Sequence, residues 1–287
     1  MRPLSEQLKP DVLRSLGGFS LMARNAVAGI MSGLHSSVSK GSGGDFQQYR
    51  QYAQGDDLRY VDWKLYARQE RLYHKVCRDD TIMRCAVLVD ASASMAYQGR
   101  GSALSKYQYA AILTACFAAV AAAQNDSVSL FVYGGGAMRR IEFGRRDSLA
   151  WLVDQLGEIS PAGNAAYGDL LQDVEVFLGA SRGLVVIASD FIDCDIVSLL
   201  RRFSAAERDL RICHVLDGDE LELPFSGTLR FKDAESGEEL VAAPDAVRES
   251  YKRAVDKWLD EFRETVLEAG ALYHFGTSGS SFLEYFC

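Results

Sequence analysis

The chain has 287 residues, 48% of them hydrophobic and 24% charged, which suits one large domain, or one domain with sizeable additions, around an extensive core. Its net charge of −8 argues against nucleic-acid binding driven by attraction to phosphates. The charge is uneven, because residues 1–80 carry 12 Lys and Arg against 9 Asp and Glu, so the acidic excess lies in the remainder. This mildly basic amino-terminal part predicts either an internal docking surface or a surface for a partner.

Several features predict a cytoplasmic location. The six cysteines are scattered without a Cys-x-x-Cys pair, and most lie in apolar runs, as expected of small buried side chains in a reducing compartment. The first seven residues are too polar for a secretory signal. The longest apolar tract, residues 110–123, is shorter than the roughly 20 residues of a membrane span, so we expect no transmembrane segment.

Residues 1–80 are predicted to form an amino-terminal extension. The first 40 residues are typical of one or two short helices, and the Ser- and Gly-rich segment 36–44 predicts a loop. Residues 45–80 mix aromatic and charged side chains, which favours turns and short strands.

A regular alternation of strands and helices follows, and it defines a predicted domain over residues 81–287. Several of the strands are apolar throughout, which is typical of a mainly parallel sheet that helices cover on both faces. The fold class is therefore α/β, with an open, Rossmann-like sheet. Strands are expected at 85–90, 127–133, 184–189, 210–216 and 271–275, and helices at 106–124, 170–178 and 196–207, with another that Asp147 caps and that ends at Leu156.

Two features near the carboxyl end depart from this alternation of strands and helices. Residues 229–232 and 239–241 flank a Ser-Gly turn, which predicts a β-hairpin insertion at about 219–243. Residues 245–270 form a long amphipathic pattern, whose apolar stripe indicates a face packed on the core or, alternatively, a face that docks a partner.

The richest chemical signal is the apolar strand that runs into Asp90-Ala91-Ser92-Ala93-Ser94. A carboxylate with hydroxyls two and four residues later places three oxygen ligands on one turn, and Mg²⁺ prefers oxygen ligands. Open α/β sheets bind ligands at the carboxyl ends of their strands. The segment therefore predicts a Mg²⁺ site at Asp90, Ser92 and Ser94. The alternative is that Asp90 only caps the helix that follows.

A second strand, residues 184–189, also ends in a carboxylate, Asp190. If the two strands are neighbours, Asp90 and Asp190 lie side by side. Like charges held so close repel unless a cation or a proton intervenes, which favours a metal ion there. Asp190, too, has the alternative role of a helix cap.

The Asp-x-Ser-x-Ser turn resembles the metal-ion-dependent adhesion site of von Willebrand factor A domains. The resemblance implies a Thr ligand from a third loop, but the matching stretch, residues 160–169, has no Thr and carries an Ala in its place. The carbonyl of Asn164 is the candidate substitute. This departure predicts either weak Mg²⁺ binding or a site that no longer binds metal.

A further block resembles the bacterial family called domain of unknown function 58 (DUF58). It reads Gly-Asp-Asp-Leu-Arg-Tyr-Val-Asp-Trp over residues 55–63 and is followed by Ala67-Arg68. The resemblance implies an A-type domain that works beside a MoxR-type AAA+ ATPase, and its motif is read either as an internal clamp or as a partner-binding segment. The residues concerned are Asp56, Asp57, Arg59, Asp62, Trp63 and Arg68.

These observations predict a non-enzymatic interaction module with a protein partner, with peripheral association with membrane proteins as one setting. The resemblance to DUF58 implies a chaperone-like or complex-assembly role for it. An alternative is a metal-free scaffold that binds through residues 45–80. A third reading, a serine hydrolase, comes from Gly-Ala-Ser-Arg-Gly at 179–183, centred on Ser181. It is disfavoured because a nucleophile elbow needs a strand before the Ser and a helix after it, and here the order is reversed.

Overall fold

The computed structural model describes most of the chain. The described residues are 3–14, 18–37, 46–52, 61, 65–66, 68, 71–77, 82–134, 137–165, 168–179, 183–192, 194–204 and 208–286. They fall into two compact units, one of residues Met1–Gly33 and Met83–Cys287 and the other of Leu34–Ile82. These units divide the predicted extension of residues 1–80 between them.

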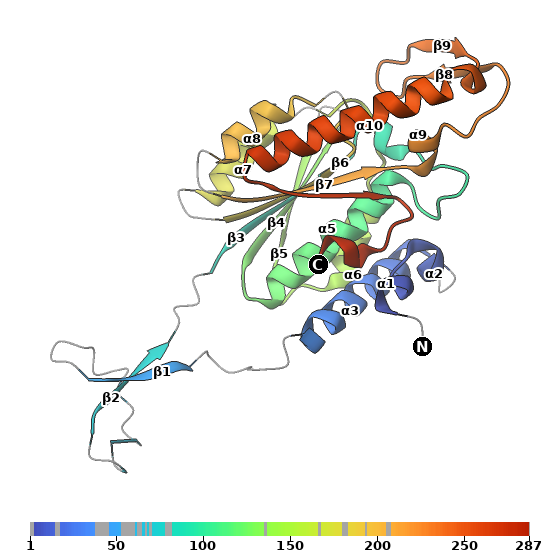
Figure 1. Cartoon of the computed structure of the whole chain (residues 1–287). Helices are drawn as coiled ribbons and strands as arrows, with labels where there is room; N and C mark the ends of the chain where they lie inside the picture. Colours follow the sequence, from blue (N-terminus) through green and yellow to red (C-terminus); the bar gives the residue numbers. More distant parts are fainter. Residues whose placement is uncertain are drawn as a thin grey trace. The chain divides into compact units, whose positions relative to one another are not determined.

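The larger unit is built on a six-stranded sheet in the order β10-β7-β6-β3-β4-β5 (Figure 1). Neighbouring strands are parallel except for β5, which runs antiparallel to β4 at one edge. The predicted α/β class with an open, mainly parallel sheet is confirmed. The strands are β3 (Arg84–Asp90), β4 (Ser127–Gly134), β5 (Ala137–Phe143), β6 (Gly183–Ser189), β7 (Asp209–Leu216) and β10 (Leu272–Thr277).

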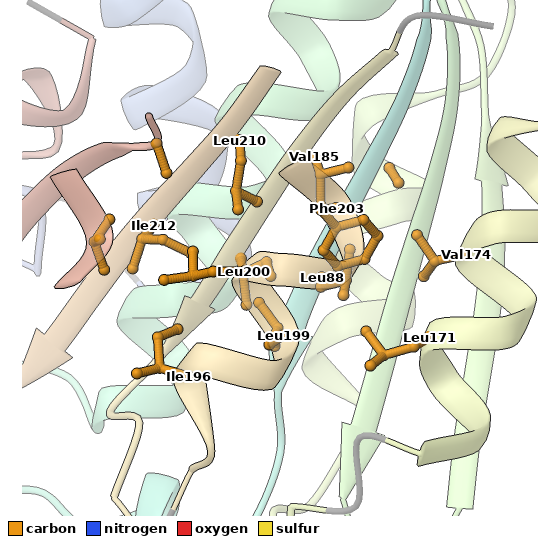
Figure 2. Close-up of a cluster of buried hydrophobic side chains, with 14 of the residues drawn as sticks. Leu88, Leu171, Val174, Val185, Ile196, Leu199, Leu200, Phe203, Leu210 and Ile212 are labelled. Atoms are coloured by element: carbon orange, nitrogen blue, oxygen red, sulfur yellow. The ribbon is translucent and has the colours of Figure 1, made fainter. Parts of the chain in front are cut away.

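Helices cover both faces of the sheet, as the apolar strands require (Figure 1). On one face lie α5 (Lys106–Ala123) and α6 (Leu149–Gly157), and on the other α7 (Gly168–Leu178), α8 (Ile196–Ser204) and α10 (Pro244–Glu268). Side chains of α7 and α8, such as Val174 and Phe203, meet Leu88 of β3 and Val185 of β6 in a continuous buried cluster (Figure 2).

Helix α5 is buried on almost every side, which fits its sequence of small and apolar residues. Ser105 begins it with a capping box, in which its hydroxyl accepts from the backbone of Gln108 and its own N–H donates to the Gln108 side chain. The first residue, Lys106, is completely buried. A buried lysine at this position requires a nearby negative charge.

The amino-terminal helices α1 (Leu4–Gln7), α2 (Pro10–Arg14) and α3 (Phe19–Ser37) precede the sheet. Residues 4–33 of these helices lie in the larger unit, where the hydroxyl of Ser20 donates to Asp154 of α6 and Leu8 accepts from Phe282 of the short helix η3 (Phe282–Tyr285). In the smaller unit, β1 (Phe46–Gln51) pairs antiparallel with β2 (Tyr73–Cys77), in agreement with the short strands expected there.

The predicted insertion is a short helix, α9 (Gly218–Glu222), followed by a hairpin of β8 (Leu229–Lys232) and β9 (Glu239–Ala242). Helix α10 then begins with Pro244 at its first turn. Its apolar stripe reaches the core only in its second half, at Phe262 and Val266. The first half of the stripe is partly exposed, with Val247 42% exposed.

Two expectations about the region after β4 are wrong. Residues 137–143 form the antiparallel strand β5, where no strand was expected. Helix α6 has Ser148 at its N-cap, whereas the carboxylate of Asp147 accepts from the backbone of Gly144 in the preceding turn. Asp147 therefore stabilises the turn and does not cap the helix.

Candidate functional site

The Asp-x-Ser-x-Ser turn lies at the carboxyl end of β3, a central strand of the sheet. Asp90 Oδ1 accepts from the backbone N–H of Ser92 at 2.7 Å, and the hydroxyls of Ser92 and Ser94 lie 3.1 Å apart. The short helix η2 (Ala93–Ala96) continues the turn. Gly134 of β4 allows this close packing, because a Cβ there would lie 2.2 Å from the carbonyl oxygen of Ala91.

The carboxylate of Asp90 is buried, with only 1% of the residue exposed. Ser189, at the end of the adjacent strand β6, donates its hydroxyl to Asp90 Oδ2 at 2.6 Å. Burial, reinforced by the charge of Asp190, raises the pKa of Asp90 to about 6, against the lowering effect of these hydrogen bonds. A nearby positive charge would relieve this unfavourable burial.

Asp190 is equally buried but is already neutralised. Lys106 Nζ donates to Asp190 Oδ2 at 2.8 Å and to Glu220 Oε1 at 2.5 Å. Burial alone would lower the pKa of Lys106, but the two carboxylates outweigh it and hold that pKa above its ordinary value. Asp190 Oδ1 also accepts from the backbone of Ile192 at 3.2 Å, so the carboxylate orders the loop after β6 as well.

Glu220 reaches Lys106 because α9 begins with a capping box. Asp217 accepts from the backbone of Asp219, while the backbone N–H of Asp217 donates to Glu220 Oε2 at 2.7 Å. Asp217 Oδ2 also accepts from the hydroxyls of Ser102 and Ser278, at 2.6 and 2.7 Å. Although burial raises it, these bonds hold the pKa of Asp217 below its ordinary value. Asp217 thus fixes α9 beside the candidate site.

The third loop packs directly on the Asp-x-Ser-x-Ser turn. Ala93 donates its backbone N–H to the carbonyl of Gly163 at 2.8 Å, and Ala162 donates to the carbonyl of Ala91 at 2.9 Å. Asn164 is exposed and lies on the wall of a cavity of about 370 Å³ together with Glu235 of the hairpin. The loop is therefore bonded to the turn, and Asn164 lies on its exposed side.

A second cavity, of about 300 Å³, adjoins the same turn. Ser94 lies on its wall beside the carboxylates of Glu220 and Glu235 and the aromatic rings of Phe231 and Tyr251. The end of the sheet thus opens into a recess with an acidic and aromatic lining, and the hairpin contributes part of that lining.

Comparison with known families gives a match over most of the chain. The family described as "Protein of unknown function DUF58" matches residues 48–259. The chain belongs to this family. The chain is also 27% identical over 271 residues to uncharacterized proteins of Mycobacterium bovis (Mb1516) and Mycobacterium tuberculosis (Rv1480), with 91% of this chain and 83% of each relative covered.

Solved structures also resemble this DUF58 chain, at a distance. They include the conserved hypothetical protein BatB of Bacteroides thetaiotaomicron (TM-score 0.44, 15% identity, 68% of this chain and 90% of that chain covered). An aerotolerance-related membrane protein of Bacteroides fragilis gives a TM-score of 0.43 at 18% identity, with 68% and 91% covered. These similarities are too remote to extend to function. Within the described residues of the present chain, no helix is both long and apolar enough to cross a bilayer.

The DUF58 block upstream of the sheet is largely outside the described residues. Asp56, Asp57, Arg59, Asp62 and Trp63 all fall there, as does Ser181 of the hydrolase reading. Arg68 is described and is exposed. Neither the clamp nor the partner-binding role of this block is tested by the structure, and both stay predictions. The order around Ser181 is helix α7 before and strand β6 after, which is the reverse of a nucleophile elbow.

The residues at the strand ends of this DUF58 protein fit Mg²⁺ in kind and in charge. Among the described residues, no three His, Cys, Asp or Glu side chains converge in a metal-binding group, so a cation would depend on the Ser92 and Ser94 hydroxyls and on water. Mg²⁺ commonly retains several waters and binds through one or two carboxylates. Burial also raises the pKa values of Glu220 and Glu235, and the ammonium of Lys106 is shared between Asp190 and Glu220. Negative charge therefore exceeds positive charge at the site, and a bound cation would balance it.

Four residues of the site escaped the sequence analysis. Ser189 immediately precedes Asp190, and its position at a strand end was the available signal. Lys106 is the one charged residue at the start of an otherwise apolar helix, which is an unusual place for a buried residue. Glu220 is the third residue after Asp217, as in a capping box. For Glu235, nothing local in the sequence marks a side chain that turns inward.

Proposed function

We propose that this DUF58 protein is a non-enzymatic interaction module that binds a partner protein through a Mg²⁺-dependent site at the carboxyl end of its sheet. One observation carries the proposal: the buried carboxylate of Asp90 shares a single turn with the hydroxyls of Ser92 and Ser94, and no cation of the chain is bonded to it in the described part. Buried carboxylates are normally paired with a cation or coordinate a metal.

Each residue has a distinct part in this proposal. Asp90, Ser92 and Ser94 would hold the ion, and Ser189 orients Asp90 through its 2.6 Å hydrogen bond. Asp190 contributes charge from beside the ion while Lys106 keeps it from repelling Asp90 at full strength. When bound, Mg²⁺ supplies the positive charge that attracts a carboxylate of the partner. Such recognition is directional and is sensitive to chelators.

The partner that we propose is a MoxR-type AAA+ ATPase, in a chaperone-like or complex-assembly role. The support for this choice is the resemblance of the Gly-Asp-Asp block to the family, together with the family match over residues 48–259. We place the interaction in the cytoplasm, with membrane proteins as one class of client that the assembly reaches peripherally.

A capture experiment tests the proposal. The immobilised chain is mixed with a MoxR-type ATPase in Mg²⁺ or in EDTA, and the bound fraction is measured for the wild type, Asp90→Ala and the control Asp256→Ala. Asp256 is an exposed carboxylate on α10, so it matches the change of charge without touching the site. We expect capture by the wild type and by Asp256→Ala in Mg²⁺, and its loss in EDTA and in Asp90→Ala. Capture that Asp90→Ala leaves unchanged would contradict the Mg²⁺-dependent mechanism.

A second candidate is a metal-free scaffold that binds through residues 45–80. Two observations favour it: the third loop lacks a Thr, and Lys106 already neutralises Asp190. The scaffold predicts that EDTA has no effect on capture and that Arg59→Ala abolishes it while the circular dichroism spectrum stays the same. The Mg²⁺-dependent module predicts the EDTA loss in both the wild type and Arg59→Ala.

A further inference from the structure

The tip of the hairpin carries a carboxylate that points inward. In the stretch from Lys232 to Val241, which the structure describes in full, Glu235 is the one residue that is not exposed. A glutamate at a solvent-facing turn ordinarily points into water, because burying its charge is costly. The partial burial of Glu235 must therefore be explained by the part of the protein that its side chain contacts.

That surface is the Asp-x-Ser-x-Ser turn. Glu235 and Ser94 lie on the wall of the same cavity of about 300 Å³, and Glu235 also borders the cavity of about 370 Å³ beside Asn164. Burial raises the pKa of Glu235, side-chain hydrogen bonding to the hydroxyls of Ser94 and Ser92 lowers it, and the charge of Asp190 raises it further. The carboxylate of Glu235 thus shares a cavity with Ser94 of the candidate metal site.

The turn that presents Glu235 is well ordered. Asp233 Oδ1 accepts from the backbone N–H groups of Glu235 and Ser236 at 3.0 and 2.6 Å, and from the Ser236 hydroxyl at 2.8 Å. The backbone of Asp233 pairs with the carbonyl of Glu238 at 2.8 Å. Gly237, with φ of 75°, closes the turn in a conformation that favours glycine.

The base of the hairpin is tied to helix α10. Asp245 accepts from the backbone of Gly227 at 2.9 Å, and Arg248 donates to the carbonyls of Leu223 and Phe225 at 3.0 and 2.7 Å. Phe231 of β8 packs edge-on against Phe225, with ring centroids 6.0 Å apart. The hairpin is therefore braced so that its tip reaches the site.

We infer that Glu235 is an internal ligand of the candidate metal site, where its carboxylate takes the place beside Ser94 that a carboxylate of a partner would take. The inference rests on the proposed function, since it needs the metal site to exist. It adds a regulatory step: a partner with an acidic side chain must displace Glu235, and the hairpin holds the site closed until it does. The same carboxylate would strengthen metal binding in the absence of a partner.

Mn²⁺ provides the test, because it substitutes for Mg²⁺ and the water protons around it relax in proportion to the exchangeable waters that it keeps. Calorimetry gives the affinity of Mn²⁺, and water-proton relaxivity reports the open positions on the bound ion. Both are measured on the wild type, Glu235→Gln, Glu235→Ala and the control Glu238→Gln. Glu238 is an exposed glutamate at the same tip, so it matches the charge and the location.

We expect Glu235→Gln and Glu235→Ala to bind Mn²⁺ more weakly, by about 10- to 100-fold, and with higher relaxivity per bound ion, because water replaces the lost carboxylate. Glu238→Gln should match the wild type. Unchanged affinity and relaxivity in both Glu235 variants, with Mn²⁺ binding intact in the wild type and lost in Asp90→Ala, would overturn the internal-ligand inference and leave the proposed function standing. Absence of Mn²⁺ binding in the wild type would overturn both.

Discussion

The ends of strands β3 and β6 look alike in sequence and differ in chemistry. Each strand is largely apolar, and an aspartate that is 1–2% exposed ends β3 (Asp90) or directly follows β6 (Asp190). Asp190 is bonded to the ammonium of Lys106, whereas Asp90 is held by a backbone N–H and by the Ser189 hydroxyl. Lys106 neutralises the carboxylate of Asp190, whereas in the described part of the chain the carboxylate of Asp90 is bonded only to neutral donors.

This difference assigns separate roles to the two positions. A buried ion pair such as Asp190–Lys106 fixes the geometry around it, because breaking one partner leaves an uncompensated charge. Asp90 keeps its unmatched charge beside two hydroxyls, which is the arrangement that a cation can use. An apolar strand followed by Asp is therefore not enough to identify a metal ligand. Whether the carboxylate can bind a metal depends on which group of the chain it is bonded to.

The largest effect is expected from removing the ammonium. Lys106→Met should lower the free energy of unfolding by about 3–5 kcal/mol in urea denaturation, because Asp190 and Glu220 then lose their shared buried counter-ion. Lys252→Met is the matched control. It breaks the exposed pair with Glu222 and should cost at most about 1 kcal/mol. Equal, small losses in both variants would show that Asp190 does not depend on Lys106.

On the Asp190 side, the free energy of unfolding should depend on pH through His214 of β7. This side chain is fully buried among the rings of Phe191, Trp258, Phe262, Tyr273 and Phe275. Burial lowers the pKa of His214 to about 4, while the charge of Asp190 raises it and that of Lys106 lowers it. As the pH falls, His214 therefore becomes protonated in the unfolded chain before it does in the folded chain. The stability that the neutral His214 contributes is complete above about pH 6.5 and is lost as the pH falls toward 4, by up to about 3 kcal/mol.

His214→Gln isolates this contribution. Asp90, whose pKa is raised to about 6, acts in the opposite direction, since the folded state binds its proton before the unfolded state does. The useful quantity is thus the difference in unfolding free energy between the wild type and His214→Gln at each pH. We expect that difference to shift in favour of the variant between pH 6.5 and 4. A difference that is flat across this range would refute the neutral, buried state of His214.

A smaller effect is expected on the Asp90 side. Ser189→Ala removes the hydroxyl that donates to Asp90 Oδ2, which should cost about 1.5–3 kcal/mol of unfolding free energy and raise the pKa of Asp90 further. Ser250→Ala, an exposed serine on α10, should stay within about 0.5 kcal/mol of the wild type. Denaturation at neutral pH measures the first effect, and NMR titration of the Asp90 carboxyl carbon measures the second. A pKa of Asp90 that is the same in Ser189→Ala as in the wild type would contradict the assignment of Ser189 as its hydrogen-bond partner.

The sequence predicts the fold well where burial imposes a simple pattern. The apolar runs at 85–90 and 184–189 lie within β3 and β6, and the two strands are neighbours. Asp90 is bonded to Ser189, the residue before Asp190. The strand β5 was missed because it lies at the edge of the sheet, where Arg139 and Arg140 interrupt the apolar pattern. Edge strands can mix charge and apolar residues, since only part of their surface is covered.

The partners at the site are harder to predict because they come from distant parts of the chain. Lys106 and Glu220 are separated by 114 residues, and Ser189 and Asp90 by 99. Glu235 reaches the site only because a hairpin, its ordered turn and helix α10 are assembled together. The amino-acid sequence around each residue does not predict these contacts. The sequence therefore locates the candidate site and the structure supplies its charge balance.

The most direct test of the central claim is a calorimetric titration of Mg²⁺ and Mn²⁺ into the wild type, Asp90→Ala and Asp190→Asn. The account predicts saturable binding by the wild type, its loss in Asp90→Ala, and binding that is weaker by about tenfold but still measurable in Asp190→Asn, since Asp190 acts through its charge and is already paired with Lys106. No binding by the wild type, or equal binding by the wild type and Asp90→Ala, would contradict the claim that the end of strand β3 is a metal site.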